Sequence, residues 1–199
     1  MNNDVQQSPR ADIYLLLATL FRQAPNDTLI QWLSELDTQD KTSAMSADWQ
    51  ALSDAAKSGQ LEVLAAEYQD LFIGIGRGEV VPFASWHRSG ALMEKPLIEL
   101  RQDLDALGFE RNESVKEPED HIAALCEVMA MLIEDGSHQQ GVFFQRHIES
   151  WYKDLVKQIQ QANSADFYRV VASLLVSFME LEAVALSEQA IAVRSSELD

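Results

Sequence analysis

Apolar residues recur every three or four positions along most of the chain, which is the spacing of one face of an α-helix. No segment alternates apolar and polar residues as a half-buried strand does, and no internal repeat is present. The chain is therefore expected to fold as an all-α, single-domain bundle of about seven to nine helices spanning residues 1–199. The spacing predicts helices over approximately 9–23, 29–36, 49–58, 61–73, 96–107, 118–134, 138–161 and 164–186.

Two segments interrupt this helical pattern. The first, residues 74–92, begins with closely spaced glycines and continues through Pro82. Because proline fixes φ and lacks an N–H, an exposed, extended course is expected after it, through Phe83, Ser85 and Trp86. These rings could cover the apolar side chains of a bound peptide or fill a gap between helices. The second segment, 109–117, is a polar linker at which a hinge is expected.

The glycines at positions 74, 76 and 78 leave three interpretations open. Glycine lets backbone N–H groups converge on a phosphate, but a dinucleotide fingerprint needs G-x-G-x-x-G after a strand and a P-loop needs a following Lys-Ser/Thr. Neither template is met. The loop is therefore a phosphate site of another kind, a tight structural turn, or a loop whose conformation places residues 82–87 in a groove.

A second group of polar residues lies at the start of the helix predicted from Pro118. Proline at the first helical position would make Glu117 the N-cap and place Glu119 in the first turn, where acids favour the positive helix end. Capping alone explains these two acids. Asp120 and His121 would diverge by about 100° around that helix, so they could line a cavity with another element.

The charge balance of 15 basic and 32 acidic residues gives a formal net charge of −17. Such a surface opposes nucleic acid and anionic lipid and suits a cationic peptide. No apolar run approaches the ~20 residues of a membrane span, and the amino terminus lacks the features of a signal peptide. A cytoplasmic protein is therefore expected. Cys126 is expected to be a buried structural thiol.

Common catalytic and metal-binding patterns are missing from the sequence. There is no H-E-x-x-H zinc motif, no repeated E-x-x-H and no G-x-S-x-G. We therefore expect no bound metal, no catalytic residues and no enzymatic activity. A weak nucleotide hydrolase that uses the glycine loop, or a helical adaptor without peptide specificity, are the alternatives.

The motif E-Y-x-x-L-F-x-G-x-G…P-x-x-S at 67–85, together with E-P-x-D-H-I at 117–122, resembles the TorD/DmsD family of cytoplasmic chaperones. Members of that family mature molybdenum-containing redox enzymes for twin-arginine export. The resemblance implies a chaperone that binds the leader and core of a molybdopterin-dependent oxidoreductase until the cofactor is inserted. The stretch from Gly76 to Trp86 is closest to forms associated with formate dehydrogenase, and a DMSO or TMAO reductase is the other client type.

The resemblance also implies a binding site for the leader peptide and a mode of assembly. Aromatic residues would contact apolar side chains, Asp120 with Glu117 would bind the leader's arginines, and His121 would adjust the site or the hinge. No cofactor is implied apart from weak binding of GTP, and the chain would be a monomer or a helix-exchanged dimer. The implied leader-binding residues are Tyr68, Phe72, Pro82, Phe83, Ser85, Trp86, Glu117, Asp120 and His121.

Overall fold

The computed structural model describes residues 8–38, 43–75, 77–110 and 115–196, with side chains described as far as residue 189. These residues form ten α-helices and two π-helical segments, and they contain no strand beyond one isolated bridge, so the predicted all-α class is confirmed. The elements are α1 (Pro9–Arg22), α2 (Asp27–Ser34), α3 (Ser46–Ser58), α4 (Leu61–Tyr68), η1 (Gln69–Ile73), α5 (Ala84–Ser89), α6 (Lys95–Ala106), α7 (Ile122–Glu134), α8 (Gln140–Phe144), η2 (Gln145–Glu149), α9 (Tyr152–Gln161) and α10 (Phe167–Ser196).

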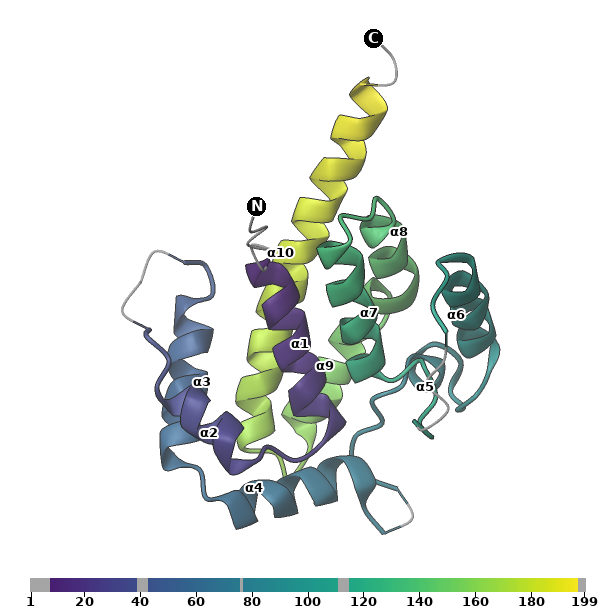
Figure 1. Cartoon of the computed structure of the whole chain (residues 1–199). Helices are drawn as coiled ribbons and strands as arrows, with labels where there is room; N and C mark the ends of the chain where they lie inside the picture. The colour runs from purple at the N-terminus through teal and green to yellow at the C-terminus, as the bar shows by residue number, and fades with distance from the viewer. Residues whose placement is uncertain (1–7, 39–42, 76, 111–114, 197–199) are drawn as a thin grey trace.

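Helices α1, α7 and α10 form the centre of the bundle (Figure 1). Helix α1 packs most extensively against α7, and α10 packs against α3 and α9. Tyr14 of α1 meets Phe178 of α10 edge to face, with ring centroids 4.8 Å apart. Helices α5 and α6 pack mainly on each other at one side of the bundle, and the C-terminal part of α10 extends beyond the other helices (Figure 1).

Helix α10 contains a 23-residue stretch, Phe167–Gln189, that is long and apolar enough by composition to cross a membrane. The expectation that no apolar run approaches this length was therefore wrong. In the structure, 44% of the most apolar window of that stretch is buried against the rest of the protein. Length and composition alone are weak evidence for a span, because the core helix of a soluble protein has the same properties.

The N-terminus of α10 is capped by a side chain from a distant helix. Glu67, buried on α4, accepts hydrogen bonds from the backbone N–H groups of Asp166, Phe167 and Tyr168 at 2.8–3.1 Å. These donors have no partner inside the helix, and the carboxylate also complements the positive end of the helix dipole. The helix begins at Phe167 rather than at residue 164, and the hydroxyl of Ser164 donates to the carboxylate of Glu79.

The predicted helix over 138–161 is divided at Trp151, which has φ −146°. The indole N–H of the buried Trp151 donates to the carbonyl of His147 at 2.6 Å. In a continuous α-helix that carbonyl would accept from the backbone N–H of Trp151, which bonds Ile148 instead. This division, together with the short helix α5, explains why the described residues form more helices than the seven to nine expected.

Three further features of the helices also differ from the sequence analysis. Helix α7 begins at Ile122 rather than near Pro118, so residues 117–121 precede the helix. The segment after Pro82 forms α5 instead of an extended, exposed loop. The C-terminal helix continues to Ser196 rather than ending near residue 186.

The Glu67 cap predicts a loss of stability on neutral substitution. Glu67→Gln would keep one acceptor oxygen but turn an NH₂ group toward backbone donors, so we expect a loss of about 1–3 kcal/mol in the free energy of unfolding. Urea denaturation measures this loss, and Glu62→Gln, an exposed change on the same helix, is the matched control. Equal urea midpoints for the two variants would contradict the capping role.

Candidate functional site

Two backbone hydrogen bonds join the two segments that the sequence analysis singled out. The N–H of Ala84 donates to the carbonyl of Asp120, and the N–H of Ile122 donates to the carbonyl of Pro82, both at 2.9 Å. Phe83 and His121 thus form an isolated antiparallel bridge, which we call the central bridge. It connects the start of α5 to the start of α7.

Asp120 supports this bridge from inside the protein. Its side chain is 1% exposed, and Oδ2 accepts from the backbone N–H of Ser85 at 2.8 Å, in the first turn of α5. The carboxylate therefore caps α5. In this conformation Asp120 presents no surface to an incoming arginine, so its role in binding a leader stays a prediction that requires α5 to move.

His121 is the N-cap of α7, and it precedes the helix rather than lying on its first turn. Its Nδ1 accepts from the backbone N–H of Ala123 at 3.1 Å, and its ring meets Phe83 edge to face at 4.9 Å. The expected divergence of Asp120 and His121 around a helix was therefore wrong. Burial, with a contribution from the positive charge of Arg22, lowers the pKa of His121 to about 3 and keeps the imidazole neutral.

Two of the four aromatic residues predicted for the leader site, Tyr68 and Phe72, pack in or against the core. The hydroxyl of Tyr68 donates to the carbonyl of Phe21, and Phe72 packs against Phe21, Tyr68 and Tyr168 with centroids 5.0–5.8 Å apart. Burial raises the pKa of Tyr68 to about 12. Pro82 and Ser85 are also buried, so the expected exposure of this segment was wrong.

Phe83 and Trp86 are half-buried and keep part of their rings at the surface. The guanidinium of Arg77 lies 4.7 Å from the centroid of a Trp86 ring, at cation–π distance. These two rings remain the aromatic candidates for contact with a peptide.

The glycine segment adopts the geometry of a tight turn. Gly74 has φ +60°, and a Cβ at Gly74 or Gly78 would collide with backbone atoms of Arg77 or Leu71. The N–H of Val80 then returns to the carbonyl of Leu71 at 2.8 Å. Of the three interpretations, this geometry favours the structural turn, while Gly76 lies outside the described residues.

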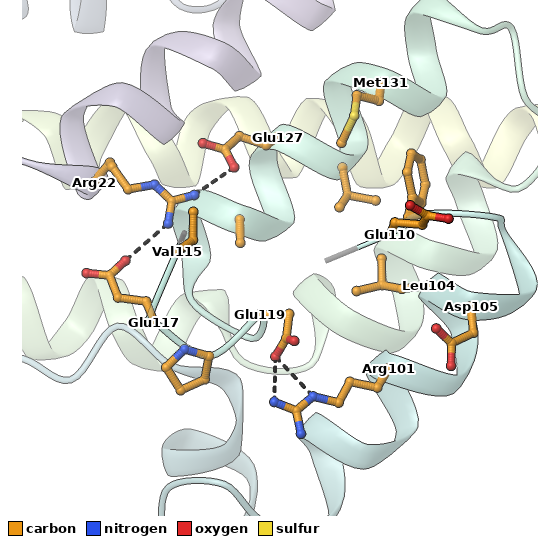
Figure 2. A pocket seen from close by; sticks show the side chains of 14 residues that line it. Arg22, Arg101, Leu104, Asp105, Glu110, Val115, Glu117, Glu119, Glu127 and Met131 are labelled. Carbon is orange, nitrogen blue, oxygen red and sulfur yellow. Dashed lines mark hydrogen bonds and ion pairs between the residues drawn. The ribbon is translucent and has the colours of Figure 1, made fainter. Parts of the chain in front are cut away.

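A groove of about 280 Å³ opens beside the central bridge, between the end of α1, α6, residues 109–110 and 115–119, and α7 (Figure 2). Its lining combines apolar and charged side chains, which we call its floor and its rim respectively, and we call the whole the acidic groove. Apolar lining comes from Leu104, Phe109, Val115, Pro118, Ala124, Val128 and Met131. Charged lining comes from Arg22, Arg101, Asp105, Glu110, Glu117, Glu119 and Glu127.

Two arginines of the chain bind carboxylates on the rim (Figure 2). Arg22, the last residue of α1, donates from Nη1 to Glu117 at 3.1 Å and from Nη2 to Glu127 at 2.6 Å. Arg101 of α6 donates from Nε and Nη2 to one oxygen of Glu119 at 3.1 and 2.9 Å. Because five carboxylates face two guanidinium groups, the rim keeps an excess of negative charge.

Of the residues predicted for the leader site, only Glu117 is among the described residues that line the acidic groove. The sequence analysis missed Arg22, Arg101 and Glu127. Glu127 carried a usable signal, because it is the one charged residue of α7 before the final residue, Glu134. Arg22 carried none, since it lies 95 and 105 residues from its two partners.

Other reactive groups lie away from this groove or are inert. Cys126 is buried, as predicted, and burial raises the pKa of its thiol far above the ordinary value. Within the described part of the chain, no group of three or more His, Cys, Asp or Glu side chains is placed to hold a metal ion.

Comparisons with known proteins agree with the sequence resemblance. Residues 38–157 match the model of the nitrate reductase delta subunit family. The chaperone protein TorD of Vibrio parahaemolyticus is 30% identical over 64% of this chain and 65% of its own length. TorD of Vibrio cholerae is 28% identical over 90% of this chain and 92% of its own length.

A solved structure shares the fold. The structure described as a candidate redox enzyme maturation protein of Archaeoglobus fulgidus superposes with a TM-score of 0.61. It covers 90% of this chain and 97% of that protein, at 18% identity. At this identity the likeness concerns the arrangement of helices alone.

The buried neutral His121 predicts a pH-dependent stability. Its pKa is lower in the folded chain than the ordinary value of 6.5, so the stability is complete above pH 6.5 and declines as the pH falls. Between pH 6.5 and 5 the loss attributable to this residue is up to about 2 kcal/mol.

Urea denaturation across this pH range measures that loss in the wild type and in His121→Asn. Asparagine keeps an N-cap acceptor and does not titrate, so the variant should lose less stability on acidification. His87 and His147, whose pKa values are also lowered by burial, are present in both proteins. Both proteins therefore keep a residual slope of unfolding free energy against pH. Identical slopes would contradict the assignment to His121.

Proposed function

We propose, because the chain belongs to the nitrate reductase delta subunit family, that it is a redox-enzyme maturation chaperone that binds the twin-arginine leader of its client. The similarity, over 90% of this chain, to a protein named as a TorD chaperone supports the chaperone role. The client is a molybdenum-containing oxidoreductase, of the formate dehydrogenase or the DMSO/TMAO reductase type. The chaperone acts in the cytoplasm before export and catalyses no reaction itself.

The acidic groove is the observation that carries this proposal. A twin-arginine leader presents two guanidinium groups followed by an apolar stretch, and the groove offers carboxylates around an apolar floor. Charge-assisted hydrogen bonds between arginine and carboxylate are roughly twice as strong as neutral ones and can be bidentate. Apolar residues of the leader would cover Leu104, Val128 and Met131.

The central bridge supports the proposal because it connects the predicted leader residues to this groove. Glu117 lies on the rim, while Asp120 and His121 follow within four positions and fix the ends of α5 and α7. Phe83 and Trp86, on the other side of the bridge, offer partly exposed rings. In this proposal, a few of the motif residues contact the leader directly, and most of them hold the contacting residues in position.

Isothermal titration with a twin-arginine leader peptide tests the proposal. We expect the double variant Glu117→Gln/Glu127→Gln to bind about 1–2 kcal/mol more weakly and with a flatter salt dependence, because ion pairs become neutral contacts. Glu62→Gln, exposed on α4, is the control for the loss of a carboxylate. Unchanged affinity of the double variant would reject the groove as the leader site.

The same titration separates the proposal from its alternatives. A leader with both arginines changed to lysine should bind more weakly, since lysine lacks the planar fork that matches a carboxylate. An adaptor without peptide specificity would bind both peptides equally. GTP and ATP, titrated in the same way, test the nucleotide-binding alternative. Hydrolysis of either nucleotide above a buffer control would contradict a chaperone without catalytic activity.

Trp86 offers a separate test through contact area. Trp86→Ala should reduce leader binding while the melting temperature stays within a few degrees, because the ring is only half-buried. Trp32→Ala, on the exposed face of α2, removes a ring of the same size elsewhere and should leave binding unchanged. A large loss of stability in Trp86→Ala would mean that the ring fills the core.

A further inference from the structure

We propose that Arg22 is an internal competitor for the leader, occupying the two carboxylates that a leader arginine takes when it binds the acidic groove. This inference rests on the proposed function, since it concerns how the same groove exchanges its occupant. Its basis is the geometry of one guanidinium group shared between two elements.

Arg22 connects three parts of the chain around the groove. From the last turn of α1 its two terminal nitrogens reach Glu117, ahead of α7, and Glu127, on α7 (Figure 2). Each nitrogen serves a different carboxylate. The side chain of Arg22 therefore makes the contacts that an arginine of a peptide would make at this place.

The exposure of the three side chains permits exchange. Arg22 is 24% exposed, whereas Glu117 and Glu127 are 42% and 44% exposed. The carboxylates are thus accessible from solvent while the arginine that binds them is more enclosed. A ligand can approach Glu117 and Glu127 before Arg22 leaves, and after exchange both acids remain paired.

This arrangement selects the ligand by chemistry. Displacing Arg22 breaks two charge-assisted hydrogen bonds, so the occupant must supply a guanidinium group that restores both. A neutral or apolar segment would leave two partly buried carboxylates without a partner, which is unfavourable. Arg22 therefore protects the groove from general apolar peptides and raises the discrimination for arginine.

Arg101 and Glu119 form a second internal pair across the groove, held through one carboxylate oxygen. Arg101 hydrogen-bonds this one carboxylate, whereas Arg22 hydrogen-bonds two, so displacing Arg22 breaks ion pairs with more acids. We therefore assign the larger effect on affinity to Arg22.

Isothermal titration of the leader peptide into wild type, Arg22→Gln and Lys153→Gln tests the inference. Arg22→Gln should bind roughly tenfold more tightly and with a steeper salt dependence, because the peptide then forms ion pairs without breaking internal ones. Lys153→Gln removes the same charge from a pair with Glu180 outside the groove and should bind as the wild type does. Equal or weaker binding by Arg22→Gln than by the wild type would overturn the inference.

Arg22→Lys provides a second variant that keeps the charge and does not depend on tolerance of the neutral change. Lysine offers one nitrogen where Arg22 uses two, so it should compete less well for the two carboxylates. The affinity of Arg22→Lys for the leader should therefore lie between those of the wild type and Arg22→Gln, roughly threefold above the wild type. Affinity at or below that of the wild type would count against competition by Arg22.

NMR of arginine side chains gives a direct readout of the exchange. With ¹⁵N-labelled arginine, the Nε–H signal of Arg22, assigned by its loss in Arg22→Lys, should shift toward that of a solvated arginine when unlabelled leader is added. A signal that does not move at saturating leader would overturn the inference while leaving the proposed function intact. If the wild type and all variants fail to bind the leader, the proposed function itself fails.

Discussion

The central bridge is the contact on which the geometry of the candidate site depends. Helices α5 and α6 pack mainly on each other, so their position relative to the bundle is determined by few contacts. The two backbone hydrogen bonds between residues 82–84 and 120–122 supply the most regular of these. Leu104 and Asp105 of α6 and Val128 and Met131 of α7 line the acidic groove. The bridge acts together with the bonds from Arg146 and His147 to Asp103, which also hold α6 against the bundle.

Buried polar groups stabilise the bridge on both sides. Asp120 caps α5 and His121 caps α7, so one pair of adjacent residues satisfies backbone donors of two helices. Glu67 does the same for α10 over a long sequence separation. An orphaned buried donor costs about 1–3 kcal/mol, which explains why acidic and histidine side chains are found in otherwise apolar surroundings here.

Helical periodicity was sufficient to predict the fold class and most helices, because apolar spacing is a local property of the chain. The start of α7 was mispredicted for a physical reason. Pro118 suits the first position of a helix, but residues 120–122 are engaged in pairing with 82–84, and a residue in that bridge is extended, as His121 is with ψ 138°. Tertiary pairing thus overrode the local preference of proline.

The candidate site was harder to predict, because its contacts join residues far apart in sequence. The E-P-x-D-H segment was recognised as important, yet its residues divide between scaffold and rim in a way that spacing cannot reveal. Asp120 and Glu117 lie three positions apart, and one is buried under α5 while the other is 42% exposed and bound to Arg22. Their difference arises from the direction of the chain at the central bridge.

Exposure therefore distinguishes the acids that maintain the fold from those available to a partner. A buried carboxylate such as Glu67 or Asp120 is engaged by backbone donors, and moving it would leave those donors without a partner. A half-exposed carboxylate such as Glu127 is solvated whenever its arginine departs, so it can exchange one guanidinium group for another at small net cost. With a formal charge of −17 spread over the chain, net charge attracts a basic peptide to the surface in general. Under the proposed function, selection of the binding place depends on these few exchangeable acids, which lie beside an apolar floor and are already paired with arginine.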